Sequence, residues 1–175
     1  MKKAVLTFGL VSAAVALAGM AATTPLILAG DHAKSDLLGY SAMVLSALLV
    51  FFGVRWYRER EEGPLGFGRA FAVGLLITLV SALVQVAAFQ VLYFKLVPGF
   101  GDAFVACMID RAADAGESPE TIARTAETAR TLKRLYDSPA TNAALTFASP
   151  LPIGVVASAL SAAFLRRRAA RAAKA

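Results

Sequence analysis

Three polar side chains at helical spacing could do chemistry inside an otherwise apolar segment of the chain. Thr78, Ser81 and Gln85 recur three or four residues apart, so they share one face of a helix. In a membrane-spanning helix, such a face either lines a path for a solute or makes hydrogen bonds to a neighbouring helix. We favour interhelix hydrogen bonds, and a polar path at an oligomer interface is the alternative.

No ionisable side chain accompanies these polar residues. Asp, Glu, Lys, Arg and His are absent from 4–30, 37–54, 70–94 and 138–165. Ionisable groups inside a bilayer mark proton relays and coupled transport, and hydrolases need a nucleophile with its base, or a metal. The only histidine, His32, lies beside Asp31 and Asp36, which are too few ligands for a metal site. We therefore predict no catalytic residue, no cofactor and no metal, and we expect that the protein is not an enzyme.

The length of the charge-free windows predicts the elements that position these residues. About 20 helical residues cross a hydrocarbon core of about 30 Å, and each window has at least 18 residues. The mean hydropathy is +0.63, and 58% of the residues are hydrophobic. We predict an all-α integral membrane four-helix bundle, a single membrane domain over 1–175. Its spanning helices are expected at about 4–30, 37–54, 70–94 and 140–165.

Small residues recur every four positions in two of these predicted helices. One row is Ala70, Gly74 and Thr78, and the other is Gly154, Ser158 and Ala162. Rows of small residues let helix backbones approach closely. We therefore expect Gly74, Gly154, Ser158 and Ala162 to pack helices together, either within the bundle or against a second copy or another membrane protein.

Prolines and glycines divide the last third of the chain. Region 95–137, with seven acidic and six basic residues, should form a helical insert between helices three and four. Gly116 should end its first helix, and Ser118 followed by proline is typical of the start of a second. Pro150 and Pro152 should bend or break the fourth spanning helix.

Arginine and aromatic residues at the ends of the apolar segments indicate orientation. We interpret six of them as topology anchors: Arg55, Trp56, Arg58, Arg166, Arg167 and Arg168. Eleven Lys and Arg residues fall in the N-terminus, the loop 55–69 and the C-terminus, against Lys34 alone in the first connection. The positive-inside rule then predicts that both termini and the loop are cytoplasmic and that insert 95–137 is extracytoplasmic.

The net charge of +6 lies at the ends of apolar segments and not in a basic groove, so the expected partner is the lipid bilayer and not nucleic acid. The N-terminus also resembles a secretory signal peptide with a cut after Ala21. The apolar run continues to Ala29, however, so we favour an uncleaved first helix.

Several short patterns, in order, resemble a known family. They are Tyr40-x-x-Met43, Phe51-Phe52-Gly53-Val54-Arg55-x-Tyr57-Arg58, Phe67-Gly68-x-Ala70-Phe71-x-Val73-Gly74, Pro98-x-Phe100 and Leu151-Pro152-x-Gly154-x-x-x-Ser158-x-x-x-Ala162. Together they resemble the bacterial membrane proteins called domain of unknown function 4199, over about residues 10–166. The resemblance implies a four-helix protein of the bacterial inner (cytoplasmic) membrane, and it supplies no catalytic residues.

Two functions of different classes follow from these observations. The first is a non-enzymatic structural or interaction component of the inner membrane, whose insert and cytoplasmic loop face partners or lipid. The alternative is a small transporter or channel subunit that works as an oligomer, with Thr78, Ser81 and Gln85 lining its path.

Overall fold

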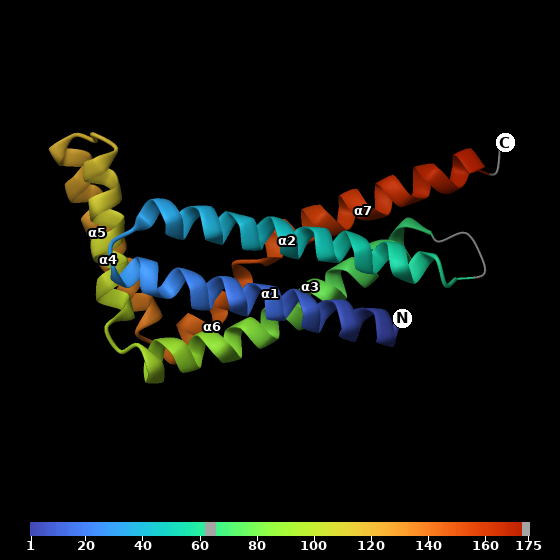
Figure 1. The fold of residues 1–175 in the computed structure, drawn as a ribbon, viewed down its shortest axis with the longest axis horizontal. Coiled ribbons are helices and arrows are strands. Elements are labelled where there is room, and N and C mark those ends of the chain that lie inside the picture. Colours follow the sequence, from blue (N-terminus) through green and yellow to red (C-terminus); the bar gives the residue numbers. More distant parts are fainter. Residues whose placement is uncertain (62–65, 173–175) are drawn as a thin grey trace. The chain divides into compact units, whose positions relative to one another are not determined.

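The chain is mainly helical in the part that the computed structural model describes, which is residues 1–61 and 66–172, with side chains described as far as Leu165. The elements in order are α1 (Lys2–Leu28), α2 (His32–Arg58), α3 (Phe67–Val91), the π-helix η1 (Leu92–Leu96), α4 (Phe100–Asp114), α5 (Pro119–Tyr136), α6 (Pro139–Ala148) and α7 (Leu151–Ala172). Figure 1 shows this order by colour. The all-α class predicted from the sequence is therefore confirmed.

Among the described residues, four segments are long and apolar enough to cross a membrane. They are Lys2–Leu28, His32–Arg58, Phe67–Leu96 and Pro139–Leu165, each with a mean hydropathy of at least 1.7 over its most apolar window. Only 17% of that window is buried in the second segment and 11% in the fourth. Apolar side chains on the outside of a helix are what a lipid-facing surface requires.

The helices extend beyond the charge-free windows from which we predicted them. We expected the second spanning helix to start at about residue 37, but α2 starts at His32 and Asp36 lies inside it. The cap is Asp31, whose Oδ1 accepts a hydrogen bond from the Lys34 backbone N–H at 3.2 Å. The turn between α1 and α2 contains Gly30, at a φ of +74°. A charge-free window marks the apolar stretch of a helix and not its hydrogen-bonded ends.

The same correction applies to the other predicted boundaries. Helix α3 begins at Phe67, not at 70, and the helical path continues through η1 to Leu96, not to 94. The fourth predicted helix, 140–165, is two helices, because Ser149 and Pro150 interrupt it between α6 and α7. Pro150 and Pro152 have no backbone N–H to donate, so the break expected at these residues is found. Helix α7 then continues past the predicted end to Ala172.

The chain divides into two compact units. Unit 1 comprises Met1–Ala16, Ala42–Gln85 and Phe147–Ala175, and unit 2 comprises Leu17–Ser41 and Val86–Thr146.

Unit 1 packs parts of α1, α2, α3 and α7 around one apolar cluster. Each of these helices contributes a buried residue to the cluster: Val5, Val54, Ile77 and Leu165. Val54 and Ile77 have no exposed surface. The N-terminus, the end of α2, the start of α3 and the end of α7 lie at the same end of this unit (Figure 1). Consecutive spanning helices therefore run antiparallel within unit 1.

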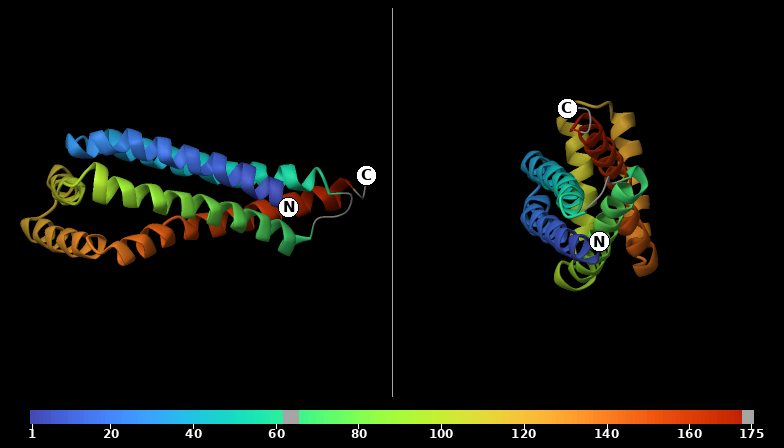
Figure 2. Two further views of the ribbon diagram at one scale, coloured as in Figure 1. Left: turned by 90° about the horizontal axis from the view of Figure 1, so that it is seen from below. Right: turned by 90° about the vertical axis from the view of Figure 1, so that its right-hand side faces the viewer.

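Unit 2 contains η1, α4, α5 and most of α6, together with the adjoining parts of α1, α2 and α3. Helices α4 and α5 pack against each other (Figure 2). Its buried core consists of Leu92, Tyr93 and Phe100. Gly116, at a φ of +72°, follows α4, and the Ser118 side chain accepts the Thr121 N–H at the start of α5, as the sequence predicted for both helix ends.

Candidate functional site

The two rows of small residues meet each other in unit 1. A methyl group added at Gly74 of α3 would lie 2.6 Å from Ser158 Oγ and 3.1 Å from Ser158 Cα on α7. One added at Gly154 would lie 2.6 Å from Thr78 Oγ1. The pairing Gly74–Ser158 and Thr78–Gly154 is that of antiparallel helices. At these positions, each glycine makes room for a hydroxyl-bearing side chain of the other helix.

The hydroxyl groups at this contact are satisfied within their own helices. Thr78 Oγ1 donates to the Gly74 carbonyl at 3.1 Å, and Ser158 Oγ donates to the Gly154 carbonyl at 2.6 Å. Ala162, one turn beyond Ser158, is buried in the apolar cluster of unit 1. The contact is therefore close packing between helix backbones and not a hydrogen-bonded bridge between helices.

The residues expected along a polar path are not joined by hydrogen bonds among the described side chains. Ser81 is buried, and Gln85 is half-buried on the next turn of α3. Neither lines the cavity described below. The other glutamine of α3, Gln90, donates from Nε2 to the Pro139 carbonyl at 2.7 Å, at the start of α6. The transporter or channel alternative stays a prediction.

The expected topology anchors of α2 lie in a small polar and aromatic cluster. Arg55 Nε donates to Glu59 Oε1 at 2.8 Å. Trp56 packs edge-on against Phe8 of α1, with ring centroids 6.0 Å apart, and the Arg60 guanidinium lies 3.6 Å from the centre of the Trp56 ring. Arg58 is half-buried. Arg166, Arg167 and Arg168 belong to α7 by their backbone, and their side chains lie outside the part that the structure describes.

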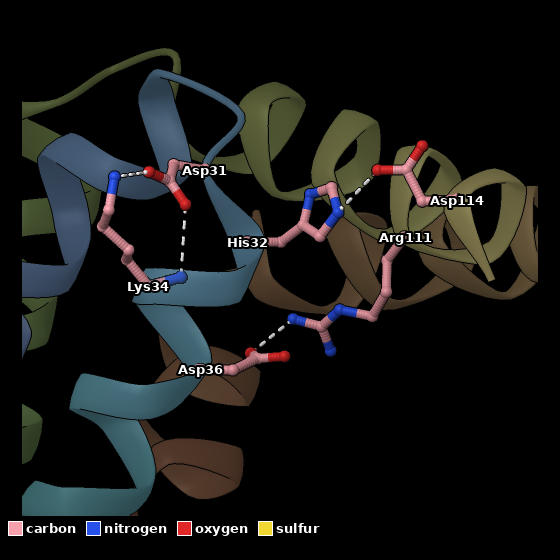
Figure 3. Close-up of polar contacts among 6 residues, drawn as sticks. All are labelled: Asp31, His32, Lys34, Asp36, Arg111 and Asp114. Atoms are coloured by element: carbon pink, nitrogen blue, oxygen red, sulfur yellow. Dashed lines mark hydrogen bonds and ion pairs between the residues drawn. The ribbon is translucent and has the colours of Figure 1, made fainter.

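An ionic cluster joins the start of α2 to α4 in unit 2 (Figure 3). His32 Nε2 lies 2.9 Å from Asp114 Oδ2, and Arg111 Nη2 donates to Asp36 Oδ1 at 2.5 Å. His32 Nδ1 is buried without a hydrogen-bond partner. These contacts were not predicted, because nothing in the local spacing of His32 and Asp36 indicates partners about eighty residues away.

Unit 2 also contains a half-open cavity of about 180 Å³ that was not predicted from the sequence. Its lining residues are Ile27, Phe89, Tyr93, Phe100, Gly101, Phe104, Lys133 and Tyr136. The rings pack mainly edge to face: the Phe89 and Phe100 centroids are 5.8 Å apart at 86°, and those of Tyr93 and Phe100 are 6.0 Å apart at 66°. Two aromatic pairs at i,i+4, Phe89/Tyr93 and Phe100/Phe104, were the available sequence signal.

Polar groups at one side of this cavity are already paired. Tyr93 Oη donates to Asp137 Oδ1 at 2.7 Å, and Lys133 Nζ lies 3.1 Å from Asp137 Oδ2 and 3.5 Å from Asp102 Oδ1. The Tyr93 hydrogen bond, followed by the Lys133 contact, lowers the pKa of Asp137 below its ordinary value. The ammonium group of Lys133 is thus balanced by two carboxylates.

No cluster of three or more His, Cys, Asp or Glu side chains suited to a metal ion occurs among the residues with described positions. The only cysteine, Cys107, is buried in α4, and burial is the main cause that raises the pKa of its thiol.

The chain is similar to a known family of proteins. The model of a family described as "Protein of unknown function (DUF4199)" matches residues 7–167, which is nearly the whole chain. No curated protein and no solved structure is significantly similar to the chain. The resemblance noted from the sequence patterns is therefore confirmed.

Proposed function

Because the chain belongs to the DUF4199 family of proteins of unknown function, its role has to come from its own residues, and we propose a non-enzymatic component of the bacterial inner membrane. In this proposal four segments span the bilayer, and the α4–α5 hairpin between the third and fourth spans binds another membrane protein or a second copy of the chain.

The observation that carries the membrane part of the proposal is the outward exposure of large apolar side chains. Leu6 and Leu10 on α1, Val44 and Leu48 on α2, and Leu160 on α7 are all exposed. Leu6 and Leu10 share one face of α1, and Val44 and Leu48 share one face of α2, because each pair lies four residues apart. A soluble protein rarely exposes large apolar faces. Lipid chains would cover these faces in a bilayer.

The interaction part of the proposal is supported by the contrast between these faces and α5. Only Ala129 is buried among the residues of α5, and polar side chains such as Arg124, Glu127 and Thr131 are exposed. One side of α5 packs against α4, and these side chains lie outside that contact. A polar face of this kind is suited to a protein or headgroup surface outside the hydrocarbon.

Photo-crosslinking in native membranes tests both parts. A benzophenone amino acid at Thr131 of α5 should give protein adducts of defined mass, which the same group at Leu48 of α2 should not give because Leu48 faces lipid. Purified adducts identify a second copy or another membrane protein by mass spectrometry. Lipid adducts alone at both positions, or release of the chain from membranes by alkaline carbonate, would contradict the proposal.

A further inference from the structure

We propose that the aromatic cavity of unit 2 is a binding site for a neutral apolar molecule about the size of one ring, taken up from the membrane. The proposal concerns a ligand of this chain and goes beyond its role as a membrane component.

The size and lining of the cavity indicate the size and polarity of its ligand. The cavity has a volume of about 180 Å³, and five of its eight lining residues are Phe or Tyr. An apolar protein cavity of about 150 Å³ has room for one benzene molecule. A ring-sized apolar molecule would therefore fit here and contact the aromatic walls.

The charges around the cavity indicate a neutral ligand. Lys133 is the one charged side chain that lines the cavity, and it already contacts Asp137 and Asp102. An anionic ligand would have to compete with two carboxylates for this ammonium group. A cationic ligand would meet Lys133 itself, so neither charge is favoured.

The backbone around the cavity holds its walls in an unusual arrangement. Tyr93 lies within the π-helix η1, a form that is rare and often found at functional sites. A methyl group added at Gly101 would lie 2.5 Å from Tyr93 Oη, so Gly101 leaves the space that the Tyr93 hydroxyl group occupies. The hydrogen bond from Tyr93 to Asp137 then fixes the phenol.

The position of the lining residues in the chain indicates the source of the ligand. Ile27 belongs to the last turn of the Lys2–Leu28 segment, and Phe89 and Tyr93 lie near the end of the Phe67–Leu96 segment. Phe104 and Tyr136 belong to α4 and α5, outside the candidate spans. The cavity thus lies where the chain leaves two apolar segments, and neutral apolar molecules concentrate in the adjoining hydrocarbon.

Photolabelling of the full chain in lipid nanodiscs tests the proposal. The probe is 3-trifluoromethyl-3-phenyldiazirine, whose carbene inserts into nearby C–H and O–H bonds after loss of N₂, and the competitor is trifluoromethylbenzene. Mass spectrometry should find adducts on the cavity-lining residues that excess competitor suppresses. Adducts on lipid-facing Leu6 and Leu10 should persist, because partition into lipid does not saturate.

Variants separate a site from general partition. Phe104→Trp should fill the cavity and weaken the competitor's apparent affinity by about tenfold. Ala106→Trp, which adds the same ring at an exposed position of α4, should leave the affinity unchanged. If Phe104→Trp loses the helical circular dichroism of the parent protein, Ile27→Phe replaces it as the test variant, because it fills the cavity from α1. Adducts in unit 2 that competitor does not suppress, or equal affinity in the folded filled variants and the parent, would overturn the proposal.

Discussion

At the scale of single residues, the α3–α7 contact depends on two glycines, Gly74 and Gly154, which have no side chain. Gly74→Ala would bring a methyl group within 2.8 Å of Ser158 Cβ, closer than carbon atoms pack. We expect the free energy of unfolding to fall by about 1–3 kcal/mol, the usual cost of overpacking. The measurement is thermal unfolding of the purified chain in detergent, followed by circular dichroism.

Gly39→Ala is the matched control for this variant. Gly39 also lies within a helix, α2, but an added methyl group meets no atom within 4 Å. Alanine has the higher helix propensity, so stability should stay the same or rise slightly. Equal midpoints for Gly74→Ala and Gly39→Ala would show that the α3–α7 contact is not close in solution.

The Cys107 thiol should report on the folding of α4. It is 4% exposed, and burial raises its pKa, so little thiolate is present at neutral pH. A maleimide should therefore label Cys107 at least about tenfold more slowly than it labels a cysteine at exposed Ala106 in a Cys107→Ala background. The two rates should converge once α4 unfolds on heating. Similar rates at room temperature would contradict the burial of Cys107.

Sequence patterns could predict which single residues are small or polar, but not the partners that they contact. Gly74 and Gly154 were recognisable from their four-residue rows, because the helical period places them on one face. That Gly74 lies against Ser158 depends on the antiparallel register of α3 and α7, which local spacing does not encode. The contact between His32 and Asp114 likewise depends on how the helices pack and not on local spacing.

At the scale of elements, the hydrogen bond from Tyr93 to Asp137 joins η1 to the end of α5. Tyr93→Phe should lower the stability of unit 2 by about 1 kcal/mol at pH 7, an ordinary value for one hydrogen bond with a partly exposed acceptor. Tyr136→Phe is the control, because no hydrogen bond of its phenol occurs among the described contacts. Hydrogen exchange of the α5 amides, read by mass spectrometry, measures both effects.

The stability that the Tyr93–Asp137 hydrogen bond contributes should decrease as the pH falls. The pKa of Asp137 is lowered in the folded protein, so its carboxylate stabilises the fold above its ordinary pKa of 3.8. That stabilisation is lost as the pH falls through the lowered folded value. The difference between the parent and Tyr93→Phe should therefore be full at pH 7 and shrink below pH 3.8. A difference that grows on acidification would contradict the assignment.

Element boundaries were the least predictable part of the fold. The charge-free windows located all four apolar segments, because burying a charge in hydrocarbon is costly. They misplaced the ends, since Lys34 and Asp36 continue the α2 hydrogen-bond pattern outside the apolar stretch. The π-helical turn at Leu92–Leu96 left no pattern in the sequence that we could recognise. The aromatic pairs Phe89/Tyr93 and Phe100/Phe104 do not by themselves indicate that a cavity lies between them.

At the scale of the whole molecule, the distribution of charge makes a prediction about sidedness. Lys and Arg residues gather in the N-terminus, the α2–α3 loop and the C-terminus, whereas insert 95–137 has one more acidic than basic residue. The N-terminus, the end of α2, the start of α3 and the end of α7 also lie at the same end of unit 1 (Figure 1). If both termini lie on the cytoplasmic side, the chain must cross the membrane an even number of times. An uncleaved first helix makes the number of spans four.

Cysteine labelling in bacterial spheroplasts measures this sidedness. In a Cys107→Ala background, single cysteines replace Glu117, in the turn between α4 and α5, and Glu59, at the end of α2; both are exposed. A membrane-impermeant maleimide should label Glu117→Cys from outside and Glu59→Cys only after permeabilisation, because cationic loops stay on the cytoplasmic side. An N-terminal epitope that remains on the purified chain would show that the first helix is retained. Labelling of Glu59→Cys from outside would contradict the predicted orientation. Labelling of both cysteines from the same side would contradict the prediction that one spanning helix, α3, separates them.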